Sequence, residues 1–556
     1  MKQKLKGAQI LTETLRKEGV EYIFGYPGGS VLPIFDALYD SPIKFILTRH
    51  EQGAAHAADG YARATGKVGV CIATSGPGAT NLVTGIATAN MDSIPMVIFT
   101  GQVKRKMIGN DAFQEADVTG ITRPITKYNY LVKDTQNLAK IIREAFYIAS
   151  SGRPGPVLID LPVDVTIEEA VFEYPAKAEM RSYKPTCFGH SGQIKKAVKL
   201  IKESKKPVIY AGGGVIIADA IEELKQLIQK TSIPITTTLL GLGCFPETHN
   251  LSLKMLGMHG TVYANYTIMN SDLIIAIGAR FEDRVTGNTE KFAPKAKIIH
   301  IDIDPTAISK NISVDVPIVG DAKNVLQELN KIVEKPNIEP WLKQVEKWKV
   351  ENPLRYNRQG GVKPQYVLEE IYKLSGGEAV IVTEVGQNQM WAAQFYQYTK
   401  PRTFISSGGL GTMGYGLPAA IGAQIGCPDK TVFDIAGDGS IQMNIQELST
   451  AVLNKLPIKI IILNNSYLGM VRQWQELFYK KRYSHTHLVN PDFVKLAEAY
   501  GAVGFRIVKN EDVAPALKKA LKIKEPVVMD FVIEEEENVF PMVPAGEAID
   551  RMIEMA

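Results

Sequence analysis

Two polar turns near the C-terminal end of the chain carry residues that could bind a divalent cation and a diphosphate. Asp438 lies within Gly437-Asp438-Gly439 at the end of an apolar run, and Asn465 follows a second such run. Mg²⁺ prefers oxygen ligands in a near-octahedral shell that can include phosphate oxygens. One carboxylate and one amide oxygen would supply part of that shell, while the glycines let the backbone approach a diphosphate closely. This pattern predicts a site for magnesium and a diphosphate.

The residues between the two turns are expected to bring them together in space. Residues 445–453 carry apolar side chains at helical spacing, between two β-branched apolar runs. A strand, a crossover helix and a parallel strand place both turns at the carboxyl ends of neighbouring strands. Because Gly-Asp-Gly alone is common in ordinary tight turns, it is the spaced Asn464-Asn465 pair that favours a cofactor site over a structural turn.

The composition bounds the class of protein. The chain has 556 residues, too many for one core, and 45% of them are hydrophobic. A net charge of +4 is close to balance for this size, which argues against nucleic acid or an anionic membrane as partner. The four cysteines lie far apart, typical of reduced thiols, and no stretch has the length of a membrane span. The N-terminus has an amphipathic helix pattern rather than a signal peptide, so we expect a cytoplasmic protein.

Three segments alternate short apolar runs with helical patterns, which predicts an α/β protein with three open, parallel-sheet domains. Apolar runs of this kind are typical of strands buried on both faces. No sequence identity demonstrates an internal repeat between the first and the third segment. The expected organisation is a first domain over 1–165, a linker over 166–190, a central domain over 191–335, a linker over 336–365 and a last domain over 366–556.

Gly-Asp-Gly followed about two dozen residues later by Asn-Asn resembles the thiamine diphosphate (ThDP) signature of the thiamine-dependent decarboxylases and carboligases. The segment HEQGAAHAADGYAR, which contains Glu51, closely matches a second motif of that family. Taken alone, Glu51 is an acidic residue that opens a helix and stabilises its N-terminus. The resemblance implies instead that Glu51 hydrogen-bonds the aminopyrimidine ring and thereby promotes loss of the proton from C2 of the thiazolium.

Two glycine-rich segments can be interpreted in more than one way. Residues 75–81 fit an ordinary strand-to-helix turn, whereas the resemblance places Gly76 against the pyrimidine half of ThDP. Residues 409–414 satisfy Gly-x-Gly-x-x-Gly, and acidic residues follow near the spacing of a ribose-binding acid, so a NAD site is the alternative there. Because Asp438 already belongs to the ThDP signature, the ThDP interpretation is favoured.

The resemblance assigns further residues to ThDP and its metal ion. Gln387 and Asn388 correspond to the diphosphate-binding pair of the family, in which the second position is usually His, so Asn388 is a departure. Gly411 is expected on the diphosphate side and Met413 beneath the bent cofactor. The other residues that the resemblance implies are Gly439, Ser440 and Met470 for ThDP, and Asp438, Asn465 and Tyr467 for the metal ion.

A set of motifs in the central segment resembles the FAD-binding domain of the acetohydroxyacid synthases, also called acetolactate synthases. Each motif alone fits a strand-end turn of any Rossmann-like domain. Their order, and a likeness that extends over about residues 5–545, favour this family. The FAD contacts that the resemblance implies are Arg153, Gly213, Gly214, Thr238, Leu239, Met258, His259, Gly278, Arg280, Asp302 and Asp321.

Three more positions match this family and concern the reaction itself. Gln114 corresponds to a residue near the reaction centre, and Arg284 to the arginine associated with the carboxylate of the second keto acid. Trp474 corresponds to the tryptophan that selects 2-ketobutyrate over pyruvate as acceptor. Taken singly, they fit a loop residue, a surface ion pair and a core aromatic, so the joint match is what favours a catalytic interpretation.

The resemblance implies a catalytic subunit that uses ThDP, Mg²⁺ and FAD in the biosynthesis of valine, leucine and isoleucine. It would decarboxylate pyruvate and ligate the hydroxyethyl unit to a second pyruvate or to 2-ketobutyrate, giving 2-acetolactate or 2-aceto-2-hydroxybutyrate. A pyruvate oxidase-type ThDP/FAD oxidoreductase is the alternative, and the matches at Gln114, Arg284 and Trp474 favour carboligation. The family also implies a homodimer or homotetramer, with each active site shared between subunits, and a small regulatory subunit as partner.

Overall fold

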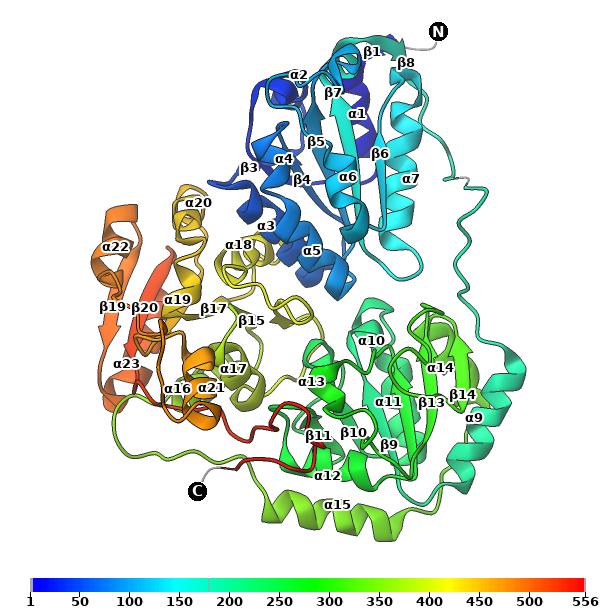
Figure 1. Cartoon of the computed structure of the whole chain (residues 1–556), viewed down its shortest axis with the longest axis vertical. Helices are drawn as coiled ribbons and strands as arrows, with labels where there is room; N and C mark the ends of the chain where they lie inside the picture. Colours follow the sequence, from blue (N-terminus) through cyan, green and yellow to red (C-terminus); the bar gives the residue numbers. More distant parts are fainter. Residues whose placement is uncertain (1–3, 179, 555–556) are drawn as a thin grey trace.

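The computed structural model describes residues 4–178 and 180–554, which form three lobes around three six-stranded parallel sheets. Figure 1 shows the N-terminal lobe in blue and cyan, the central lobe in green and the C-terminal lobe in yellow to red. A small antiparallel pair, β1 (Lys4–Lys6) with β8 (Glu169–Val171), is attached to the first lobe. The predicted fold class, α/β with three parallel-sheet domains, is confirmed.

The N-terminal sheet has the strand order β3-β2-β4-β5-β7-β6. Its inner strands β4, β5 and β7 are buried along their whole length because helices cover both faces. The strands are β2 (Tyr22–Gly25), β3 (Lys44–Leu47), β4 (Gly69–Ala73), β5 (Met96–Gln102), β6 (Tyr128–Leu131) and β7 (Pro156–Pro162). The helices are α1 (Gly7–Lys17), α2 (Leu32–Tyr39), α3 (Glu51–Thr65), α4 (Pro77–Thr80), α5 (Val83–Asp92), α6 (Val118–Thr122), α7 (Leu138–Ser150) and α8 (Val163–Ile167).

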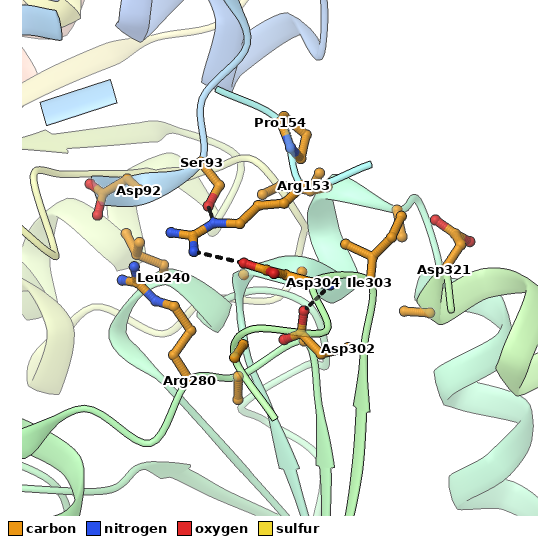
Figure 2. Close-up of a pocket in the computed structure, with 18 of the residues that line it drawn as sticks. Asp92, Ser93, Arg153, Pro154, Leu240, Arg280, Asp302, Ile303, Asp304 and Asp321 are labelled. Carbon is orange, nitrogen blue, oxygen red and sulfur yellow. Dashed lines mark hydrogen bonds and ion pairs between the residues drawn. The ribbon is translucent and has the colours of Figure 1, made fainter. Parts of the chain in front are cut away.

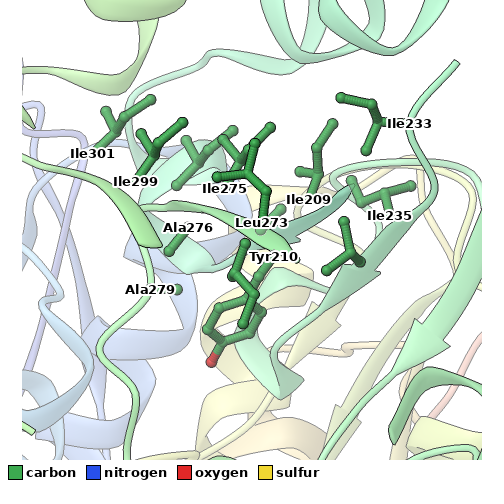
Figure 3. Close-up of a cluster of buried hydrophobic side chains, with 14 of the residues drawn as sticks. Ile209, Tyr210, Ile233, Ile235, Leu273, Ile275, Ala276, Ala279, Ile299 and Ile301 are labelled. Atoms are coloured by element: carbon green, nitrogen blue, oxygen red, sulfur yellow. The ribbon is translucent and has the colours of Figure 1, made fainter. Parts of the chain in front are cut away.

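The central sheet has the order β11-β10-β9-β12-β13-β14, which is the doubly wound order of dinucleotide-binding folds. Ile209, Ile275 and Ile299 on three neighbouring strands are fully buried in its core (Figure 3). The strands are β9 (Pro207–Ala211), β10 (Ile235–Thr237), β11 (Ser252–Met255), β12 (Leu273–Ile277), β13 (Lys297–Asp302) and β14 (Val316–Val319). The helices are α9 (Ser191–Glu203), α10 (Gly213–Ile217), α11 (Ile221–Thr231), α12 (Val262–Asn270), α13 (Asp283–Thr286) and α14 (Ala322–Ile332).

The C-terminal sheet has the order β16-β15-β17-β18-β20-β19. Numbered within each domain, this order and that of the N-terminal sheet are the same: two, one, three, four, six, five. The strands are β15 (Val380–Thr383), β16 (Phe404–Ile405), β17 (Val432–Gly437), β18 (Lys459–Asn464), β19 (Val503–Ile507) and β20 (Val527–Val532). The helices are α16 (Pro364–Ser375), α17 (Gln387–Phe395), α18 (Gly416–Gly426), α19 (Asp438–Ile441), α20 (Leu448–Leu453), α21 (Gly469–Phe478), α22 (Phe493–Tyr500) and α23 (Asn510–Lys522).

Helices α3 and α18 join the first and third lobes (Figure 1). Their contact is so close that a Cβ atom on Gly60 would overlap the carbonyl oxygen of Ala419, and one on Gly422 would overlap that of Ala57. Small residues are therefore required here because the two backbones lie against each other. This contact fixes the segment between β16 and α18 against the N-terminal lobe.

Two connecting segments have structure of their own. The stretch 336–365, expected as a linker, contains helix α15 (Glu339–Glu351), whose Trp341 donates its indole N–H to the carbonyl oxygen of Pro207 at 3.0 Å. Residues 533–553, which we call the C-terminal strap, leave the third sheet and return to the central lobe. There Val543 donates its N–H to the Met258 carbonyl at 2.8 Å, and Val543 and Ile549 are buried in the central core.

Candidate active site

The predicted strand, helix and parallel strand around the two polar turns are present, and β17 and β18 are direct neighbours. The turn after each strand places Asp438 beside Asn465, whose backbone N–H points at Oδ1 of Asp438 across 3.4 Å. Asn490 donates from Nδ2 to Oδ2 of Asp438 at 2.7 Å, and the N–H of Tyr467 donates to Oδ1 of Asn465 at 3.1 Å. A carboxylate and an amide oxygen thus meet at one edge of the sheet.

The electrostatics of this turn suit a cation. Burial raises the pKa of Asp438 to about 6, and the hydrogen bond from Asn490 opposes that shift. A divalent ion would reverse the effect, since a nearby positive charge favours the carboxylate. Within 4–178 and 180–554, no cluster of three His, Cys, Asp or Glu side chains could hold a metal. One carboxylate with one amide oxygen fits Mg²⁺ when phosphate oxygens complete the shell.

These turns line a cavity of about 90 Å³, which we call the diphosphate pocket. The Trp391 indole N–H is buried in its wall and has no hydrogen-bond partner among the described residues, which fits a pocket built for a ligand rich in acceptors. Gly411 is not in the lining, although Met413 of the same loop is. The residues assigned from the sequence that line it are Gln387, Asn388, Met413, Asp438, Gly439, Ser440, Asn465, Tyr467 and Met470.

Gln387 and Asn388 open helix α17 at the edge of this pocket. Oε1 of Gln387 accepts from Nδ2 of Asn465 at 3.1 Å, which ties the two turns of the site to a third strand end. Asn388 donates from Nδ2 to the carbonyl of Ile435 at 2.7 Å. The residue that departs from the family pattern is therefore anchored on β17 by its amide.

Glu51 belongs to a second group of residues in the N-terminal lobe. It is the first residue of α3, and its Oε2 accepts from Nδ2 of Asn81 at 3.0 Å. Gly78 lies directly against it, because a Cβ there would be 3.2 Å from Oε1 of Glu51. Gly76 has φ of 60°, and a Cβ on it would lie 2.8 Å from the carbonyl oxygen of Gln114. Glu51, Gly76 and Gln114 are thus brought together, outside the lining of the diphosphate pocket.

Arg284 and Trp474 lie on separate elements. Arg284, on α13, lines a small cavity of about 70 Å³ with Met258 and the C-terminal strap. Its Nη1 lies 4.0 Å from Sδ of Met258. Trp474, on α21, makes an edge contact with Phe478 at 5.4 Å between ring centroids. Neither residue lines the diphosphate pocket in a single chain.

A larger cavity of about 370 Å³, the central cavity, lies where the three lobes meet (Figure 2). Arg153 donates from Nε to Oγ of Ser93 at 2.8 Å and from Nη1 to Asp304 at 3.1 Å. Met258 and His259 do not line it, and burial lowers the pKa of His259 to about 4. The residues assigned to FAD that do line it are Arg153, Gly213, Gly214, Thr238, Leu239, Gly278, Arg280, Asp302 and Asp321.

The walls of the central cavity suit a dinucleotide. Gly278 has φ of 57°, and a Cβ on it would lie 2.6 Å from the Cα of Gly214, so the two loops touch backbone to backbone. The hydroxyl of Tyr210 is buried in the lining without a partner among the described residues. Arg153 and Arg280 supply positive charge for phosphates, and Asp302, the last residue of β13, places a carboxylate in the lining.

Sequence reasoning missed several residues of both sites. Asn490 holds Asp438, yet it lies in a segment with no recognised motif. Asp92 and Gly408 line the central cavity from the first and third lobes, so no motif within the central segment could have indicated them. Gly409, the first glycine of the Gly-x-Gly-x-x-Gly pattern at residues 409–414, lines the same cavity. Trp391 follows the assigned pair on α17 closely enough that helical spacing would have indicated it.

In the part of the chain that the structure describes, no helix is long and apolar enough to cross a membrane. All four cysteines are free.

Three family models match the chain in order. They are "Thiamine pyrophosphate enzyme, N-terminal TPP binding domain" over residues 5–121, the central domain of the same enzymes over 194–329, and their C-terminal TPP binding domain over 384–531. The fold and the site therefore define a thiamine pyrophosphate-dependent enzyme.

Curated relatives narrow the family. The acetolactate synthase large subunit of Haemophilus influenzae is 51% identical, covering 99% of this chain and 98% of the relative. That of Corynebacterium glutamicum is 52% identical over 98% of this chain and 90% of the relative. The acetolactate synthase isozyme 3 large subunit of Escherichia coli is 48% identical over 99% of this chain and 98% of the relative. The chain belongs to the acetolactate synthase large-subunit family, which confirms the resemblance found in the sequence.

Proposed function

We propose that the chain is the catalytic subunit of an acetolactate synthase in branched-chain amino acid biosynthesis. It decarboxylates pyruvate and transfers the remaining two-carbon unit to a second pyruvate or to 2-ketobutyrate. The observation that carries the proposal is the meeting of Asp438, Asn465 and Gln387 at neighbouring strand ends, in a chain about half identical to acetolactate synthase large subunits over almost its full length.

The residues divide the work of holding ThDP. Asp438 and Asn465 would supply oxygens for Mg²⁺, with Tyr467 beside them, and Gln387 and Ser440 would bind the diphosphate; all five line the diphosphate pocket. When bound, ThDP supplies the electron sink for decarboxylation and carboligation. Met413 would support the ring system from the loop before α18. Glu51 would hold the aminopyrimidine and exchange a proton with it through its carboxylate, whose orientation Asn81 fixes.

The acceptor keto acid would be held by Arg284 and Trp474. A guanidinium can bind a carboxylate through two parallel hydrogen bonds, which fixes the direction of the keto acid. Trp474 would pack against the extra methylene of 2-ketobutyrate, a contact that discriminates by about 1–3 kcal/mol. FAD is proposed for the central cavity, on the fit of its two arginines, Asp302 and the unpartnered Tyr210 hydroxyl.

A second copy of the chain would complete the active site. Glu51 and Gln114 lie outside the diphosphate pocket of their own chain, and Phe113 beside them is 88% exposed. Burying such a side chain against the third lobe of a partner is the economical solution, so we propose a homodimer or a homotetramer built from it. The name "large subunit" of the relatives supports a small regulatory partner, and free cysteines support a cytoplasmic location.

The test is an assay of purified chain with ThDP, Mg²⁺, FAD and pyruvate, with and without 2-ketobutyrate. We expect acetolactate without reduced acceptor dye or peroxide, and acetohydroxybutyrate when 2-ketobutyrate is added. Acetate or acetyl phosphate together with reduced acceptor would instead establish the pyruvate oxidase-type alternative.

Glu51→Gln should lower carboligation by at least about 100-fold, because the amide cannot exchange the proton that the carboxylate does. ThDP should still bind, since the metal and diphosphate ligands are unchanged. Undiminished carboligation in this variant, or a wild-type chain that binds no ThDP, would contradict the proposal.

A further inference from the structure

Asp92 lies between the central cavity and the loop that supports the diphosphate pocket. It ends α5, is 4% exposed and lines the central cavity from the N-terminal lobe (Figure 2). Its carboxylate accepts the N–H of Gly409 at 2.7 Å and that of Gly408 at 3.0 Å. Both glycines belong to the third lobe. They lie within residues 406–414, which we call the bridging loop.

A buried ion network holds Asp92 in place. Arg63 of α3 donates from Nη2 to Oδ2 of Asp92 at 2.8 Å, from Nε to Oδ1 of Asp59 at 2.6 Å, and from Nη1 to the carbonyl of Ser406 at 2.9 Å. Arg63 and both carboxylates are buried. Removing one member of such a network leaves a buried charge without its partner, so the arrangement is costly to break.

The bridging loop continues from Asp92 into the diphosphate pocket. Met413 lines that pocket, while Thr412 shares a 2.7 Å hydroxyl hydrogen bond with Thr88 of α5. The far end of the loop is fixed by Glu384, which accepts the N–H of Gly414 at 2.7 Å. Between these points Leu410 is 43% exposed. Asp92 therefore anchors the near end of the loop that carries Met413 into the diphosphate pocket.

The central cavity also contacts the near end of the loop. Arg280, in the cavity lining, donates from Nη1 to the carbonyl of Met91 at 2.6 Å, one residue before Asp92. A Cβ on Gly409 would lie 2.8 Å from Oδ1 of Asp92 and 3.3 Å from Nη2 of Arg280. A phosphate-bearing ligand that engages Arg280 would therefore bind beside the contact between Asp92 and Gly409.

We propose that Asp92 is a positioning residue that couples the two pockets, so that a flavin dinucleotide in the central cavity strengthens ThDP binding through the bridging loop. The inference rests on the proposed function, which supplies the two ligands. Coupling of this kind is reciprocal, since each ligand changes the affinity of the other by the same factor. It gives the central ligand a task that requires no redox step.

The experiment measures the dissociation constant of ThDP by calorimetry, with Mg²⁺ present, on flavin-free full-length chain with and without saturating FAD. In the wild type we expect FAD to tighten ThDP binding by about fivefold or more. In Asp92→Asn the ratio of the two constants should approach one. A merely structural role would weaken ThDP with and without FAD in parallel and leave the ratio unchanged.

Two further variants keep the test decisive. Gly409→Ala disturbs the same contact from the third lobe without removing a charge, so it should also reduce the ratio of the two ThDP dissociation constants. This variant serves as the test if Asp92→Asn does not fold. Asp304→Asn removes the partner of Arg153 within the same cavity but touches no part of the bridging loop, so FAD should bind more weakly while the ratio at saturation persists.

A ratio that stays at the wild-type value in Asp92→Asn and Gly409→Ala would overturn the proposal. A ratio that falls to one in Asp304→Asn would overturn it as well. A wild-type chain that binds ThDP with a ratio of one would contradict the coupling alone. A chain that binds no ThDP would contradict the proposed function itself.

Discussion

The first and third domains have the same strand order but carry different chemistry at equivalent strand ends. The second strand leads to Glu51 in the first domain and to the bridging loop in the third. The third strand leads to Gly76 in the first domain and to Asp438 in the third, which also places Asn465 after its fourth strand. One domain thus offers a glycine turn and a single carboxylate, and the other a set of oxygen ligands.

The difference shows what a shared scaffold decides. The carboxyl ends of parallel strands lie at the same edge of the sheet, so the order of strands determines which turns become neighbours. It does not determine whether those turns hold a cation or a ring. The two domains also meet through equivalent helices, since α3 and α18 each follow the second strand of their sheet.

The largest expected effect comes from breaking that contact between equivalent helices. Gly422→Val places a branched side chain where even a Cβ overlaps the carbonyl oxygen of Ala57. We expect a loss of about 3 kcal/mol or more, because a backbone atom cannot move aside as a side chain can. Thermal unfolding of the purified chain measures it. Gly29→Ala is the matched control, since a Cβ there meets nothing within 4 Å, and equal melting of the two variants would refute the account.

A smaller effect should separate the chemistry of the two domains. Asn490→Ala removes the amide that orients Asp438, and supporting partners of this kind are worth about 10–100-fold in metal affinity. The Mg²⁺ concentration needed for half-maximal ThDP binding should rise by that factor. Asn81→Ala removes the corresponding partner of Glu51 in the first domain and should leave the Mg²⁺ dependence unchanged. A rise in both variants would show that the division between the domains is wrong.

The smallest effect concerns a buried carboxyl pair found in the third domain. Burial raises the pKa of Glu384 to about 8, and burial beside Glu384 raises that of Asp434, whose oxygens have no partner among the described residues. The folded state then holds protons that the unfolded chain releases, so stability falls as pH rises from about 4.5 towards 8.

Asp434→Asn should flatten this decline by about 1 kcal/mol, since the amide carries no charge to bury. Thermal midpoints at several pH values between 6 and 9 would measure the slope. An equally steep decline in the variant would place the origin of the pH dependence elsewhere.

The sequence did not predict the antiparallel pair β1 and β8. In the three six-stranded sheets it predicted the inner strands but not β6, β11 and β19, each of which lies at a sheet edge. A strand buried on both faces appears as a continuous apolar run, whereas these three are interrupted by Asn129, Lys254 and Arg506. Helix α15 was not predicted for a related reason. Only a narrow stripe of the helix, with Trp341 and Val345, is buried, so its apolar pattern is weak.

The site could be predicted from the sequence where its residues belong to recognised motifs. The neighbourhood of Asp438 and Asn465 followed from one strand-helix-strand unit, so local spacing was sufficient. Asp92 contacts glycines more than three hundred positions away, and Asn490 reaches back to Asp438 from a loop without a pattern. Contacts of this kind depend on how domains and loops pack, which local periodicity does not encode.

The C-terminal strap has a consequence for how the chain is made. Domains generally fold in the order in which they are synthesised. The central domain is translated second, yet Val543 and Ile549, which belong to its core, are translated after the whole third domain. A nascent chain therefore carries an unfinished middle domain while the third domain is translated, because two residues of the middle domain's core follow the third domain in the chain.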